Sequence, residues 1–178
     1  ASSGPFTLQT PNSGIDGVSG VITISTGTSN FGNSGSINLG TGTSKSGRGG
    51  DFRLLIGTGI SGDGGDILMF AGETEMAGSA GGNVVVTAGE GSSDDNNDGG
   101  NGGALQLFGG AGQGNNELIN YGGNVEIAGG FAYAGHGGNI IQRTGYGWKT
   151  SSGIFDIATA NAGSNGVSGR VSMTPGTT

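Results

Sequence analysis

The stretch GGNVVVTAGE, Gly81–Glu90, decides the fold predicted for this chain, because it recurs in varied form along the sequence. It returns as GGDILMFAG from Gly64 and as GGNVEIAGG from Gly122. Each copy starts with glycines, continues with β-forming residues that are apolar at alternate positions, and ends with a small residue and glycine. Alternation with a period of two places the apolar side chains on one face of a strand. The recurrence indicates a repeat protein.

Division of the chain before each pair of alternating apolar residues gives eleven repeats, of which the last is truncated. They begin at Pro5, Val21, Ser36, Asp51, Asp66, Asn83, Ala104, Asn124, Asn139, Ile154 and Arg170. Five repeats are 15 residues long, two are 16, and three consecutive ones, residues 66–82, 83–103 and 104–123, are longer. The extra length of these three is expected in inserted loops.

Two columns of apolar residues run through the repeats, at the second and fourth places of each. The second place holds Phe6, Ile22, Ile37, Phe52, Ile67, Val84, Leu105, Val125, Ile140, Phe155 and Val171. The fourth holds Leu8, Ile24, Leu39, Leu54, Met69, Val86, Leu107, Ile127, Gln142, Ile157 and Met173, so Gln142 is its one polar member. A single repeat cannot bury these side chains, whereas stacked repeats form a continuous core.

The predicted fold is therefore all-β, a single parallel β-solenoid (β-helix) of about eleven turns with a thin, flat cross-section. It forms one domain over residues 1–178, and strand spacing makes the rod roughly 50 Å long. A bundle of polyproline II helices is the alternative fold, but that structure needs glycine at every third position. The glycines here follow the repeat of 15 residues instead.

Composition excludes several functions. The 178 residues include 45 Gly, no Cys and one histidine, His136, and the net charge is −7. Six Lys and Arg in an acidic chain argue against binding to nucleic acid or to an anionic membrane surface. No apolar run reaches the roughly 20 residues that span a bilayer. With one histidine and no cysteine, the chain has almost none of the residues that a Ser–His–Asp or Cys–His triad needs, so we do not expect an enzyme.

Two phrases carry a resemblance to known sequences. They are SGVITISTGTSNFGNSGSINLGTGTS, Ser19–Ser44, and AGSNGVSGRVSMTPGTT, Ala162–Thr178. Both resemble the Gly/Ser/Thr-rich repeats of predicted secreted proteins from diatoms and related marine algae. The resemblance implies a secreted protein of the cell surface or cell wall with a structural or adhesive role. It implies no catalytic residue.

Four aromatic residues form the first candidate site. Phe131 and Tyr133 lie in FAYAGHGG, and Tyr146 and Trp148 lie in YGWKTSSG of the next repeat. On a solenoid, Phe131 would stack beside Tyr146, and Tyr133 beside Trp148, as a patch that binds glycans or adheres to a surface. The alternative is that the four rings cover a local irregularity near Gln142.

The long repeats suggest an acidic corner. Their insertions carry Glu73, Glu75, Glu90, Asp94, Asp95, Asp98 and Glu117. Flexible, oxygen-rich loops suit Ca²⁺, with Glu90, Asp94, Asp95 and Asp98 as the candidate ligands. However, DDNND lacks the spacing of an EF-hand, and a solvated acidic loop without a cofactor is the simpler interpretation.

A third candidate site is an array of threonines at equivalent places of successive repeats. Its members are Thr26, Thr28, Thr41, Thr43 and Thr58. On the flat face of a solenoid, such an array resembles the ice-binding surface of some antifreeze proteins. Ordinary β-propensity also explains threonine on an exposed strand.

The function predicted from these features is an extracellular structural or adhesive module, a rigid rod that presents the aromatic patch and the acidic corner. Its expected partners are extracellular matrix, polysaccharide or another surface. A ligand-binding solenoid, for ice or glycan, is the alternative. The apolar columns also run to both ends of the chain, where ASSG and RVSMTPGTT resemble the two parts of one repeat. Exposed ladder edges at these ends predict end-to-end self-association.

Overall fold

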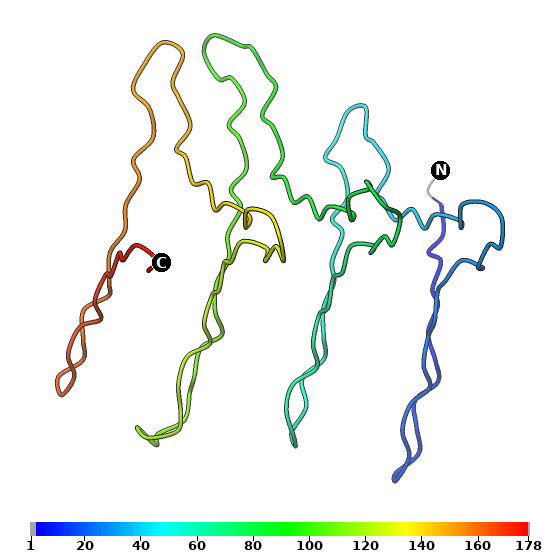
Figure 1. The fold of residues 1–178 in the computed structure, drawn as a ribbon. Coiled ribbons are helices and arrows are strands. Elements are labelled where there is room, and N and C mark those ends of the chain that lie inside the picture. The colour runs from blue at the N-terminus through cyan, green and yellow to red at the C-terminus, as the bar shows by residue number, and fades with distance from the viewer. Residues whose placement is uncertain (1–2, 178) are drawn as a thin grey trace. The chain divides into compact units, whose positions relative to one another are not determined.

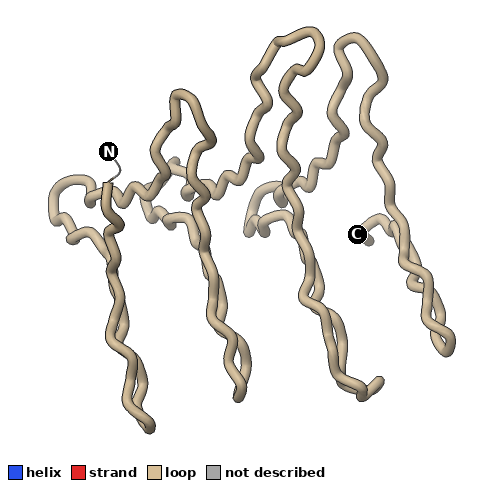
Figure 2. The backbone as a smooth tube through the Cα atoms, turned by 180° about the vertical axis from the view of Figure 1, so that it is seen from behind, coloured by secondary structure: helices blue, strands red, loops and turns tan. Residues whose placement is uncertain are grey.

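The computed structural model describes residues 3–177, and this part of the chain contains no helix and no β-strand. Figure 1 accordingly shows neither coiled ribbons nor arrows, and Figure 2 shows the described backbone as loop throughout. The prediction of a β-solenoid, or β-helix, is therefore wrong, and the chain is mostly coil. The residues that join the two chain ends in the prediction, Ala1 and Thr178, lie outside the described part.

The hydrogen bonds of the chain are not those of a solenoid. A solenoid requires each repeat to bond to the next, but every backbone–backbone hydrogen bond among residues 3–177 joins two residues of the same repeat. The one side-chain interaction that crosses a repeat boundary there is the ion pair of Arg48 with Asp51, which are three positions apart. Each repeat is therefore closed on itself instead of stacking on its neighbour.

The closure of each repeat occurs at a neck, where the sixth-place residue meets the glycine that ends the repeat. The ten necks join Thr10 with Gly20, Thr26 with Gly35, Thr41 with Gly50, Ile56 with Gly65, Ala71 with Gly82, Ala88 with Gly103, Gly109 with Gly123, Gly129 with Gly138, Thr144 with Gly153 and Thr159 with Gly169. The chain between the two residues of a neck forms a loop. We call the six residues from the first to the sixth place of each repeat its apolar segment.

The neck occupies the same place in every repeat although the loops differ in length. The loop spans nine positions from Thr26 to Gly35 and 15 positions from Ala88 to Gly103. All the inserted residues of repeats 66–82, 83–103 and 104–123 lie within loops. The apolar segments keep a constant length, so the insertions leave them unchanged.

The chain divides into two units. In the first, Ala1–Val84, four necks involve the side chain of the sixth-place residue: a Cβ added to Gly20 would lie 3.2 Å from Thr10 Cγ2. Thr26 also donates a hydrogen bond from Oγ1 to the Gly35 carbonyl oxygen at 3.2 Å. The fifth neck is a backbone bond, from the Gly82 N–H to the Gly72 carbonyl oxygen at 2.8 Å.

In the second unit, Val85–Thr178, four necks each contain a backbone hydrogen bond of the same type. The N–H of the terminal glycine donates to the carbonyl oxygen of the glycine at the seventh place. The pairs are Gly103 with Gly89 at 2.9 Å, Gly123 with Gly110 at 2.7 Å, Gly138 with Gly130 at 2.9 Å and Gly153 with Gly145 at 2.9 Å. Close approach requires glycine most clearly at the terminal position of two of these necks, because a Cβ added there would lie 3.0 Å from the Gly110 nitrogen at Gly123 and 2.9 Å from the Gly130 nitrogen at Gly138.

The apolar columns are not a core. None of the described residues is buried, so the prediction that the second and fourth places line a buried interior is wrong. Most column residues are nonetheless less exposed than the apolar residues of the loops: Ile37 in a column is 48% exposed, whereas Ile60 in a loop is fully exposed. The apolar side chains thus remain largely in contact with water.

Two loop turns need glycine for conformational reasons. Gly62 has φ of 74° and Gly78 has φ of 78°, in the left-handed region that residues with a Cβ rarely adopt. Both lie at bends of their loops, at 60–62 and 76–78. At these positions glycine sets the direction in which the loop returns to its neck.

Candidate functional site

The four aromatic residues of the first candidate site lie in two loops of the second unit. Phe131 and Tyr133 belong to the loop closed by Gly138, and Tyr146 and Trp148 belong to the loop closed by Gly153. Tyr133 is 97% exposed and Trp148 is 86% exposed. Rings this open to water are not stacked on one another, so each ring projects from its loop without contacting another of the four. Each ring has a free face for a flat partner.

Trp148 sits on a tight bend. The chain bends at residues 148–150, and a Cβ added to Gly147 would lie 2.8 Å from the Thr150 carbonyl oxygen. Real Cβ atoms essentially never lie so close to another heavy atom. Glycine between Tyr146 and Trp148 therefore allows the turn that carries the two rings.

Among the candidate calcium ligands, Asp95 forms a local turn. Asp95 Oδ1 accepts hydrogen bonds from the backbone N–H groups of Asn97 at 2.8 Å and Asp98 at 3.0 Å. These two bonds lower the pKa of Asp95, because they stabilise its charged form. Within residues 3–177 no three Asp, Glu or His side chains gather closely enough to hold a metal ion, so Glu90, Asp94, Asp95 and Asp98 are not assembled around a common centre.

The threonines of the third candidate site have two different positions. Thr26 and Thr41 are sixth-place residues at necks, and Thr26 uses its hydroxyl group in the bond to Gly35. Thr28, Thr43 and Thr58 lie in the loops beyond those necks, and all are exposed. The flat solenoid face that would align the five hydroxyl groups against ice is not formed.

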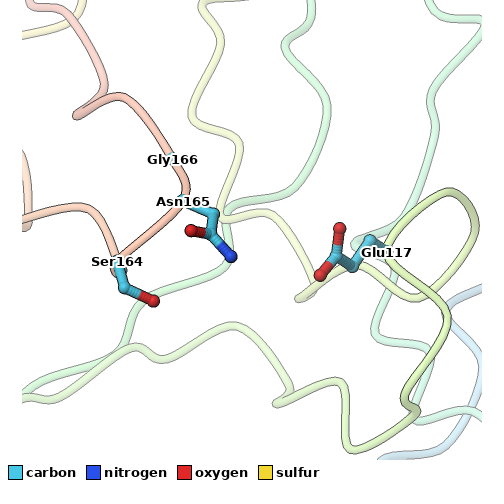
Figure 3. A pocket seen from close by; sticks show the side chains of 5 residues that line it. Glu117, Ser164, Asn165 and Gly166 are labelled. Atoms are coloured by element: carbon cyan, nitrogen blue, oxygen red, sulfur yellow. The ribbon is translucent and has the colours of Figure 1, made fainter.

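A shallow pocket that the sequence did not suggest lies within the second unit. It encloses about 370 Å³ and is lined by Glu117, Gly163, Ser164, Asn165 and Gly166. The hydrogen bond from the Gly166 N–H to the Gly163 carbonyl oxygen, at 3.2 Å, holds the turn that forms one wall. Figure 3 shows the Glu117 carboxylate pointing toward the turn that carries Ser164 and Asn165.

The chemistry of this pocket is polar. A carboxylate, an amide and a hydroxyl group together accept and donate hydrogen bonds, which suits a ligand rich in hydroxyl groups. No sequence motif marks the pocket, because Glu117 and Asn165 belong to different repeats. Asn165 lies in the repeat that begins at Ile154, which has no insertion. Only the placement of the two loops in space shows that Glu117 and Asn165 line one pocket.

The comparisons with known proteins add no relative: no family model, no curated protein and no solved structure matches this chain. Within the part of the chain that the structure describes, there is also no helix long and apolar enough to cross a membrane. The functional argument therefore depends on the residues themselves.

Proposed function

We propose that this chain is an extracellular structural or adhesive module that attaches to polysaccharide or another matrix surface through its aromatic loops. The observation that carries the proposal is the exposure of Tyr133 and Trp148 on separate loops, each closed by a glycine neck. Exposed large aromatic rings stack on flat apolar faces such as those of sugar rings.

Two further features support this proposal. The pocket beside Glu117 supplies hydrogen-bonding groups that match sugar hydroxyls. The loops are also rich in Gly, Ser, Thr and Asn, which are uncharged and well hydrated, as expected for a module that works in an extracellular matrix. Recognition by several single rings gives weak binding per loop, and repetition along the chain raises the total affinity.

The test is adsorption to insoluble cellulose and chitin, measured as binding isotherms of the purified full chain. Replacement of both Tyr133 and Trp148 by Ala removes two rings and is expected to weaken adsorption about tenfold, since each aromatic contact contributes about 0.5–1.5 kcal/mol beyond its area. Hydrogen exchange of the neck glycines Gly138 and Gly153 should stay unchanged, which shows that the loops remain closed.

The matched control replaces Ile15 and Ile60 by Ala. Both are fully exposed apolar loop residues, but they carry no ring. Adsorption of this control should equal that of the unaltered chain. Equal weakening in the aromatic variant and the control, or no adsorption by the unaltered chain to either polysaccharide, would contradict the proposal.

A further inference from the structure

The apolar segments have unused hydrogen-bonding capacity. No backbone N–H or C=O of any apolar segment within residues 3–177 takes part in a backbone–backbone hydrogen bond, because all such bonds lie in the loops or at the necks. The same segments carry the two apolar columns. Each therefore combines alternating apolar side chains with a free backbone edge, which is the combination that pairs with another chain.

The exposed area is far too large for a self-sufficient monomer. The chain exposes 18236 Å². A compact protein of 17.2 kDa exposes about 7,800 Å², and a fully unfolded one about 25,000 Å². The chain thus leaves open about 10,000 Å² that a folded protein of its size buries, and this is several times the area that a stable protein–protein interface needs.

Charge separates the apolar segments from the loops. The segments carry four acidic and three basic residues, so they are nearly neutral. The loops carry the other nine acidic and three basic residues, and thus most of the net charge of −7. Contact between segments of two chains therefore meets little repulsion, whereas contact between loops is opposed.

A second copy of the chain is the partner that fits best. Every apolar segment has the same length, and every one except that with Gln142 is apolar at both its second and fourth places. Almost any segment of one copy therefore matches any segment of another in pattern. The necks hold the loops, whatever their length, outside the segments. A foreign partner would need to reproduce this spacing, whereas a copy of the chain has it already.

We propose that the apolar segments are a self-association surface, occupied by the apolar segments of a second copy of this chain. The backbone groups of facing segments pair, and the columns of the two copies cover each other. The acidic loops remain in water and limit association through their mutual repulsion. This surface is distinct from the aromatic loops of the proposed function, and neither proposal depends on the other.

The test is sedimentation velocity of the full chain over a concentration series, at low and at moderate salt. The unaltered chain should show concentration-dependent association that becomes stronger with salt, because salt screens repulsion between the loops. The Ile37→Asp variant places a charge in a column and should weaken association at least about tenfold, the effect of losing a buried isoleucine.

The matched control is Ile60→Asp, which makes the same substitution and the same change in net charge in the loop of the next repeat. It should change association less than about twofold. A chain that stays monomeric at all concentrations, compact or expanded, would overturn the proposal, since a compact monomer would mean that its own repeats cover the columns. Equal effects of the two variants would overturn it as well, because the loops would then be the contact.

Discussion

The backbone N–H of Gly138 donates a hydrogen bond of 2.9 Å to the carbonyl oxygen of Gly130, and this bond closes the loop that carries Phe131 and Tyr133. The two glycines are not equivalent. A Cβ added to Gly138 would lie 2.9 Å from the Gly130 backbone nitrogen, whereas a Cβ added to Gly130 would have no atom within 4 Å. The neck therefore tolerates a side chain on one side only.

Gly138→Ala should open this neck, because the added methyl group pushes the two backbones apart. Loss of one such hydrogen bond costs about 1 kcal/mol, so protection of the residue 138 amide against hydrogen exchange should fall about fivefold. Gly130→Ala is the control, since it has the same effect on the unfolded chain. It should leave the protection of Gly138 nearly unchanged. Equal loss in both variants would show that the neck does not depend on close approach.

Thr26→Val should loosen the second loop. The substitution keeps the shape of the side chain but removes the hydroxyl group that bonds to Gly35. An exposed hydrogen bond contributes about 0.5–1 kcal/mol, so chymotrypsin should cleave after Phe31, in the same loop, about two- to fivefold faster. Thr41→Val, which alters a neck with no such bond among the described residues, should leave cleavage after Phe31 unchanged. Faster cleavage in both variants would contradict the assignment.

The turn at Asp95 should depend on pH. Its two backbone hydrogen bonds lower the Asp95 pKa, so the charged form stabilises the turn. This stabilisation is present above the ordinary carboxyl pKa and is lost as the pH falls through the lowered value. The amide proton resonances of Asn97 and Asp98 should therefore move upfield together at acidic pH in an NMR titration. Asp95→Asn keeps an acceptor oxygen without a titrating group, so its turn should not respond to pH.

Asn165→Ala should weaken the binding of soluble oligosaccharides if the pocket contributes to glycan recognition. Loss of one hydrogen-bonding side chain costs about 0.5–1.5 kcal/mol, or about two- to tenfold in the dissociation constant. Asn161→Ala alters the same loop outside the pocket lining and serves as the control. Calorimetry with chitin and cellulose oligomers measures both. Unchanged affinity in Asn165→Ala would remove the pocket from the recognition surface.

The sequence predicts the repeats better than it predicts their association. The divisions before Val21, Ser36 and Asp51 coincide with the glycines that close the necks, each of which lies against the side chain of a threonine at the sixth place. The places of the insertions are likewise taken from the lengths of the repeats themselves. These features are local, and local sequence determines them.

The partner of the apolar columns could not be predicted in this way. Alternation at Ile22 and Ile24 shows that one face is apolar, but it does not show what covers that face. We expected the next repeat of the same chain, and the structure leaves both side chains exposed. The proximity predicted for the acidic and for the aromatic residues depended on the same stacking between repeats. The pocket at Glu117 depends equally on the placement of loops that are distant in the sequence, so no local sequence pattern predicts it.

The independence of loop length and neck position makes the chain a natural carrier for grafted peptides. Doubling the length of a closed loop costs only about 0.6 kcal/mol in chain entropy. A foreign epitope spliced between Asp95 and Asp98, within the longest loop, would leave the neck of Ala88 and Gly103 and both flanking apolar segments with their native sequence. Ten such loops recur along one polypeptide, so a single chain offers multivalent display with each insert lying between the two residues of its own neck.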